Sequence, residues 1–145
     1  MSKKMDKKKV VAMLNKILEF ELAGVVRYTH YALMVYGHNR IPIVSWLRAQ
    51  ASESLTHANL AGEHITTLGE HPSLKIAALL ETHQHSIHEI LMEGCAHEKE
   101  QLENYHKLLE LVEDKSVFLE EYARQMIVDE ENHISEVEKM IRKPG

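Results

Sequence analysis

The chain has 145 residues, of which six are glycine and three are proline, and aromatic residues make up only 6% of it. Average proteins contain roughly twice that share of glycine and proline. A β-sandwich or β-barrel needs turn residues about every 8 to 12 positions and many aromatic or β-branched residues, so this composition argues against both. We expect one all-α domain over residues 1–145, because the length is close to the commonest domain size.

Charge and cysteine content narrow the class of protein further. The chain has 22 acidic and 17 basic side chains and a formal net charge of −5, which argues against nucleic acid as a partner. The lysine-rich start, residues 3–9, is expected to be a solvated terminus rather than a DNA-binding tail. The single Cys95 excludes an intrachain disulfide, so a cytoplasmic location is expected. No run approaches the roughly 18 apolar residues of a membrane span or resembles a secretion signal.

Two long amphipathic helices are predicted in the first half of the chain. Asp6 caps the first helix, whose apolar residues recur three and four positions apart until Gly37. Pro42 suits the first residue of the second helix, because no hydrogen bond needs its missing N–H there, and Gly69 closes that helix. The short loop between the two helices requires them to be antiparallel neighbours.

Two more helices are predicted in the second half. Ser86 and Glu89 are typical of a capping box at the start of the third helix, and Asp114 or Ser116 caps the fourth. The very short connection between these helices again makes them antiparallel neighbours. Each of the four helices has about 26 to 30 residues and is therefore about 40 Å long.

The segment from Gly69 to His85 determines the predicted topology. Its 17 residues can span up to roughly 55 Å when extended, enough to reach from one end of the bundle to the other. The second and third helices can then run parallel, in an up-down-down-up bundle with one long crossover. The alternative is a short fifth helix over Leu74–Thr82 on an up-down-up-down bundle.

Acidic and imidazole side chains interrupt every apolar stripe near its middle. In chain order these residues are Glu21 on the first helix, Glu53 and His57 on either side of Ser54 on the second, Glu98 on the third, and Glu130 and His133 on the fourth. Because each position lies near the midpoint of its helix, the polar residues meet in one layer whichever way the helices run.

Such a layer needs a source of positive charge. Burying one unpaired carboxylate costs several kcal/mol, and four carboxylates close together repel one another. Four carboxylates and two imidazoles form a ligand set for a pair of divalent transition-metal ions, which suits iron or manganese. Glu130 and His133 are three residues apart and therefore share one helical face. The alternative is a set of solvated glutamates beside ordinary core histidines.

Two segments resemble the first- and fourth-helix signatures of bacterioferritins. They are Leu14–Leu22 followed by Tyr28, and Asp129–Ile134. The resemblance extends over essentially the whole chain and implies a ferritin-like four-helix bundle that holds two iron ions. The residues that match the family's iron ligands are Glu21, His57, Glu98, Glu130 and His133. Tyr28 matches the tyrosine near the metals and is the catalytic candidate.

The resemblance also implies a function. In that family the site oxidises Fe(II) with dioxygen, and the subunits assemble into iron-storing shells. We therefore expect a ferroxidase that uses dioxygen or peroxide and forms a homo-oligomer. Two alternatives remain: a non-storage dimetal peroxidase, manganese catalase or hydroxylase, and a non-enzymatic metal- or haem-binding helical protein.

Three departures from the bacterioferritin pattern qualify this expectation. Ser54 stands where the family has a glutamate, and Glu53 is expected to substitute for it, since it can reach the same side as His57. Leu55 stands where the family has its haem-ligating methionine, so no methionine-ligated haem is expected. The chain ends at Gly145 without the fifth helix of the larger shells, so we expect a dimer or a smaller shell.

Histidine is unusually frequent, with 11 residues in the chain. Only His57 and His133 receive a ligand role in this interpretation. His71, His83, His85 and His88 gather around the crossover, where solvent-facing polarity is the favoured interpretation. A second metal site or an iron entry route is the alternative.

Overall fold

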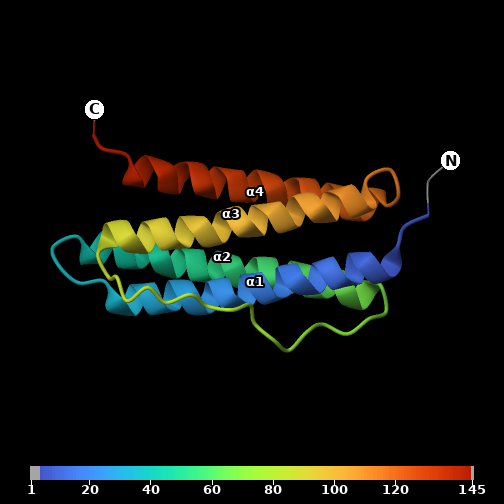
Figure 1. Ribbon diagram of the computed structural model, residues 1–145, viewed down its shortest axis with the longest axis horizontal. Helices are drawn as coiled ribbons and strands as arrows, with labels where there is room; N and C mark the ends of the chain where they lie inside the picture. The colour runs from blue at the N-terminus through green and yellow to red at the C-terminus, as the bar shows by residue number, and fades with distance from the viewer. Residues whose placement is uncertain (1–3, 145) are drawn as a thin grey trace.

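A computed structural model describes residues 4–144 as a bundle of four long helices (Figure 1). Residues 1–3, including Lys3 of the basic start, and Gly145 lie outside the described residues. The helices are α1 (Lys7–Met34), α2 (Arg40–Thr67), α3 (Ile87–Val112) and α4 (Val117–Ile141). None of the described residues lies in a strand, so the all-α prediction is confirmed.

The order of the helices in space is also the one predicted. In Figure 1, α1 and α4 run in one direction while α2 and α3 run in the other. The crossover, residues 68–86, returns the chain along the bundle, so that α2 and α3 are parallel (Figure 1). The up-down-down-up topology is therefore confirmed. No helix within residues 4–144 is long and apolar enough to cross a bilayer.

The crossover contains no helix at Leu74–Thr82, so the alternative with a short fifth helix is wrong. The segment lies extended along α1, which supplies partners for its backbone. The Ser73 amide donates to Asn15 Oδ1 at 2.7 Å, and the Ala77 amide donates to the Glu19 carbonyl at 3.0 Å. An extended chain covers the length of the bundle with few residues, and these bonds replace those that a helix would make.

Side-chain hydrogen bonds cap the N-termini of three of the helices. Asp6, Ser86 and Ser116 each accept a hydrogen bond from the backbone amide three residues later, at 3.2, 3.2 and 3.3 Å. Ser116 is therefore the cap of α4. The prediction for Pro42 is wrong by two residues, because α2 begins at Arg40 and Pro42 is its third residue. Proline fits there because the first four amides of a helix have no partner within it.

Apolar packing is divided between the two ends of the bundle. One buried cluster joins the first half of α1 to the second half of α3 and includes Leu14, Ile17, Tyr105 and Leu108. Two further clusters occupy the opposite end, one around Tyr28 and Leu47 and one around Leu91, Cys95 and Val137. The polar layer separates these apolar regions, so the ends of the bundle supply most of the hydrophobic stabilisation.

Helices α1 and α2 approach most closely beside this layer, at Gly24. A Cβ atom at Gly24 would lie 2.4 Å from Ser54 Oγ. Ser54 Oγ in turn lies 2.9 Å from both the backbone oxygen and Oε1 of Glu21, and it donates to them. The missing side chain of Gly24 therefore allows the contact between Ser54 and Glu21.

We predict that Gly24→Ala destabilises the protein by about 1–3 kcal/mol, because the added methyl overpacks the helix contact. Gly62→Ala is the matched control: a Cβ on Gly62 meets no atom within 4 Å. That variant should be as stable as the parent chain or up to about 1 kcal/mol more stable. Urea unfolding followed by circular dichroism measures both. Equal stability of the two variants would contradict the close-approach argument.

Candidate metal centre

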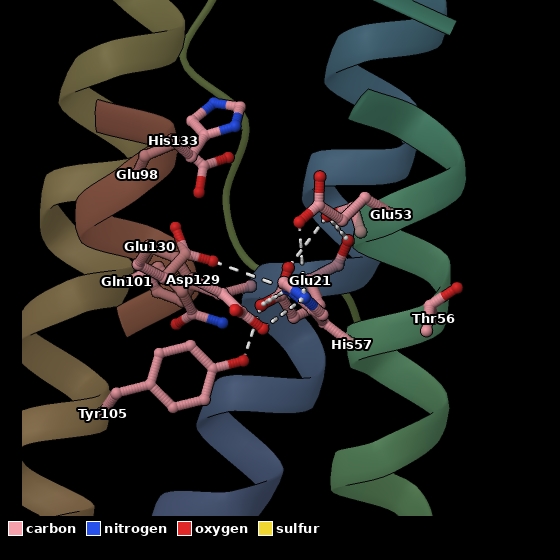
Figure 2. Close-up of polar contacts among 12 residues, drawn as sticks. Glu21, Glu53, Thr56, His57, Glu98, Gln101, Tyr105, Asp129, Glu130 and His133 are labelled. Carbon is pink, nitrogen blue, oxygen red and sulfur yellow. Dashed lines mark hydrogen bonds and ion pairs between the residues drawn. The ribbon is translucent and has the colours of Figure 1, made fainter. Parts of the chain in front are cut away.

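Three helices bring a compact group of possible ligands together in the middle of the bundle. Glu21 from α1, His57 from α2 and Glu130 from α4 are all buried. His57 Nδ1 lies 3.4 Å from Glu21 Oε2 and 3.6 Å from Glu130 Oε1 (Figure 2). One ligand atom from each residue lies within 4.8 Å of the other two. This arrangement can hold one metal ion with two carboxylates and one imidazole.

A second group adjoins the first through Glu130. Glu98 of α3 is buried and lies beside Glu130, so that each carboxyl group affects the pKa of the other. The Tyr28 hydroxyl donates to Glu98 Oε1 at 2.8 Å and lies 3.2 Å from His133 Nε2. The His133 ring stacks on Trp46, with 5.8 Å between the ring centroids. Glu98 and His133 could therefore hold a second ion, with Glu130 between the two positions.

The carboxyl groups differ in their charge state. Burial raises the pKa of Glu130 to about 8, and burial together with the charge of Glu130 raises the pKa of Glu98 well above its usual value. Burial also acts to raise the pKa of Glu21, but the hydrogen bond and positive charge of His57 outweigh it, and the net pKa is lowered. Glu21 is thus ionised at neutral pH, whereas the raised pKa values of Glu98 and Glu130 favour their protonated forms.

The histidines are affected in opposite directions. Burial would lower the pKa of His57, but the hydrogen bond and charge of Glu21 raise it. Burial lowers the pKa of His133 to about 4, so its imidazole is neutral at pH 7. A neutral imidazole has a lone pair for a metal ion.

These donors fit divalent cations. Three buried carboxylates face two imidazoles, and no lysine or arginine lines the small cavity between them, which is about 10 Å³. That volume is about the space of one water molecule or ion. Among the described residues, Glu130 Oε2 is buried without a hydrogen-bond partner. A cation would take the place of the protons that the raised pKa values favour and would use this free oxygen as a ligand.

The second helix contributes differently from the expectation. Ser54 is buried and points toward Glu21 instead of supplying a carboxylate. The Glu53 side chain is 47% exposed and its Oε1 lies 3.7 Å from His57 Nε2, on the opposite side of the ring from Glu21 (Figure 2). Glu53 lines the cavity but lies outside the compact group of three, so its ligand role stays a prediction. Leu55 is half-exposed on α2.

The sequence did not reveal three polar partners of this layer. The Tyr105 hydroxyl donates to Glu21 Oε2 at 2.6 Å (Figure 2), and Gln101, whose amide donates to the Ile17 carbonyl at 3.0 Å, helps to lower the pKa of Glu21. Asp129 Oδ2 lies 3.8 Å from His57 Nε2. Helical spacing could have predicted two of them, because Gln101 and Tyr105 follow Glu98 by three and seven residues and share its helical face.

Other residues considered from the sequence lie outside the layer. Glu93 pairs with Arg27 at 2.7 Å and accepts a hydrogen bond from Tyr31 at 2.5 Å. His97 is buried against Phe20, whose carbonyl lies 3.2 Å from His97 Nε2. Around the crossover the exposed histidines are His71, His83 and His88, whereas His85 is partly buried.

Comparisons with known proteins identify the family. A family model described as "Ferritin-like domain" matches residues 11–144. A ferritin-like, diiron-carboxylate protein from Bacillus anthracis str. Ames is 26% identical with a TM-score of 0.89, over 94% of this chain and 98% of that one. A comparison with curated proteins gave no match. The chain therefore belongs to the ferritin-like family.

Two further solved structures show the range of similar proteins. The bacterioferritin of Desulfovibrio desulfuricans, described with a diiron site, is 25% identical with a TM-score of 0.80, over 93% of this chain and 79% of that one. A dodecameric thioferritin from Bacteroides fragilis shares the fold at 21% identity, with a TM-score of 0.84 over 94% and 86% of the two chains.

The metal-free protein is predicted to lose stability as pH rises from 7 to 9. The folded-state pKa of Glu130 is about 8, above its value in the unfolded chain, so its stabilising proton is lost through this range. The expected loss is about 1 kcal/mol. Added Mn²⁺ should restore it, because the ion replaces the proton. Chemical unfolding at each pH, with and without Mn²⁺, measures the effect.

Two variants control this prediction. Glu130→Gln removes one of the titrating groups and should reduce the loss of stability between pH 7 and 9. Glu63→Gln changes an exposed glutamate on α2 and should leave the profile unchanged. A parent chain whose stability is constant from pH 7 to 9 would show that no buried proton is held here.

Proposed function

We propose that this protein binds Fe(II) as its substrate in the central layer and oxidises it with dioxygen or peroxide, as a ferroxidase for iron storage or detoxification. The observation that carries this proposal is the meeting of three buried carboxylates and two histidines from four helices, with one carboxylate oxygen unpartnered. Manganese is the alternative metal, since carboxylate and imidazole ligands suit both.

Each side chain has a proposed role. Glu21 and His57 bind the first ion, Glu98 and His133 bind the second, and Glu130 bridges them. Glu53 is proposed as the further bridging or near-bridging carboxylate from α2. Two Fe(II) ions together supply the two electrons that reduce peroxide to water or dioxygen to peroxide. The protein holds the ions at adjacent positions, where both electrons can reach one oxidant molecule.

Tyr28 is the proposed catalytic residue beside the second ion. Burial and the charge of Glu98 raise its pKa well above the usual value, so its phenol remains protonated. The hydroxyl lies between Glu98 and His133, at 2.8 and 3.2 Å. It can therefore orient both ligands and donate a proton to reduced oxidant.

A homo-oligomer, either a dimer or a small shell, is proposed for the storage role. Three large apolar side chains around the α1–α2 connection are exposed: Leu33 by 68%, Tyr36 by 80% and Ile41 by 84%. Exposed apolar groups that gather in one place mark contact surfaces. Size-exclusion chromatography of iron-loaded protein distinguishes the alternatives, because a dimer cannot enclose a mineral and would favour a non-storage dimetal enzyme.

We predict that Glu21→Ala/Glu130→Ala abolishes accelerated Fe(II) oxidation. The double variant removes two of the three ligands in the compact group, so the rate should fall by at least about tenfold, toward that of buffer. Aerobic addition of Fe(II), followed by ferric absorbance, measures the rate. Glu98→Gln keeps the side-chain shape and tests the same point if the double variant is unstable.

Glu131→Ala is the matched control for this measurement. Glu131 adjoins Glu130 on α4 but is exposed. This variant should oxidise Fe(II) at the parent rate. The proposal fails if the parent chain is no faster than buffer, or if Glu21→Ala/Glu130→Ala and Glu131→Ala behave alike.

Glu53→Gln tests whether α2 supplies a carboxylate despite Ser54. Loss of this ligand should weaken one of the two bound ions about tenfold and leave the other unchanged. Anaerobic Fe(II) titration by calorimetry resolves the two binding steps. Glu63→Gln, on the exposed side of the same helix, should bind as the parent does. If the parent chain, Glu53→Gln and Glu63→Gln all bind Fe(II) with equal affinity, Glu53 is not a ligand and the centre has three carboxylates.

A further inference from the structure

A second cluster of metal-binding side chains lies outside the central layer, where the crossover passes α1. It consists of His30 on α1 and of Glu81 and His85 on the crossover. His30 Nε2 lies 2.9 Å from Glu81 Oε2, and His85 Nε2 lies 3.9 Å from Glu81 Oε1. One ligand atom from each residue lies within 4.8 Å of the other two. None of these residues takes part in the central layer.

The backbone that carries Glu81 is held on both sides. The Leu80 carbonyl accepts a hydrogen bond from Arg27 at 3.3 Å, and the Thr82 hydroxyl donates to Glu93 at 2.7 Å. Arg27 and Glu93 are themselves joined by an ion pair that links α1 to α3. Contacts that do not involve His30 or His85 therefore hold the segment that carries Glu81 in place.

The contact between His30 and Glu81 leaves a polar atom unsatisfied. His30 Nε2 is shielded from solvent and, among the described residues, has no hydrogen-bond partner of suitable angle. Its distance to Glu81 Oε2 is nevertheless only 2.9 Å. A cation bound to both atoms would satisfy His30 Nε2 without the angle that a hydrogen bond requires.

The Glu81 carboxylate lies between the two imidazoles. Its Oε2 faces His30 and its Oε1 faces His85, while the His83 amide donates to Oε1 at 2.7 Å. The His30 and His85 ring centroids are 6.2 Å apart and the rings are inclined at 66°. The two rings thus approach the carboxylate from different directions, as the ligands of a tetrahedral ion must.

We propose that His30, Glu81 and His85 bind one divalent transition-metal ion of the zinc type, which ties the crossover to α1. Two imidazoles and one carboxylate are a ligand set found around Zn²⁺, with a fourth position left for water. Zinc bonds of about 2.0–2.2 Å in a tetrahedral site place the ligand atoms about 3.4 Å from one another. His85 must therefore move slightly closer to Glu81 and His30 slightly away from it, and small rotations of these exposed or partly buried side chains suffice.

Metal counting on the full-length protein tests this site. Metal-free parent chain is titrated with Zn²⁺ and, separately, with Co²⁺, whose visible absorption reports tetrahedral ligands. His85→Ala and Glu81→Gln should each lose one bound ion per chain at moderate metal concentration, with affinity at that site at least about tenfold weaker. The matched control is His88→Ala, an exposed histidine on the first turn of α3 outside the cluster, which should bind as the parent does.

The same titration in a Glu21→Ala/Glu130→Ala background separates this site from the central layer. One ion should remain bound there and should disappear when His85→Ala is added. If the Glu21→Ala/Glu130→Ala variant does not fold, metal counting on the parent chain, His85→Ala and His88→Ala still shows whether the cluster binds an ion. Failure of Fe(II) oxidation has no bearing on this measurement, so the two proposals stand or fall separately.

Hydrogen exchange gives a second readout. Zn²⁺ should slow exchange of the amides in residues 79–85 in the parent chain and should have no effect on them in His85→Ala. The proposal is overturned if the parent chain and His85→Ala bind the same number of ions. It is equally overturned if His88→Ala loses as much metal as His85→Ala does.

Discussion

Burial of three carboxylates in the middle of one bundle is the constraint on which the rest of this structure depends. Glu21, Glu98 and Glu130 are only 3%, 5% and 2% exposed. Two different effects limit their repulsion: Glu21 is ionised beside His57 and Tyr105, whereas burial raises the pKa values of Glu98 and Glu130 and favours their neutral forms. Without such compensation each buried charge would cost several kcal/mol. Within residues 4–144 Glu130 Oε2 has no hydrogen-bond partner, which is why we infer metal binding.

The crossover determines which helices pack together around the central layer. By returning the chain to the end where α2 began, it makes α3 pack against α1 as well as α4 (Figure 1). Tyr105 of α3 can then donate to Glu21 of α1, and Gln101 of α3 to the Ile17 carbonyl of α1. The same segment carries Glu81 and His85 to His30, so one connection shapes both the central layer and the second cluster.

Prediction from the sequence succeeded where a residue broke a periodic pattern. Glu21, Glu98 and Glu130 were found because a carboxylate in an apolar stripe is conspicuous. Tyr105 was missed because an aromatic residue in such a stripe looks like ordinary core, and only its hydroxyl contact with Glu21 shows otherwise.

Local spacing and chain length were enough to predict the helices, their caps, the crossover and the polar residues near each helix midpoint. Which of those residues meet depends on how the helices pack. Packing turned Ser54 rather than Glu53 toward Glu21, placed Glu98 beside Glu130, and placed His30 against Glu81. Periodicity shows which face of a helix a side chain occupies, but its partner depends on how closely the helices approach, as at Gly24.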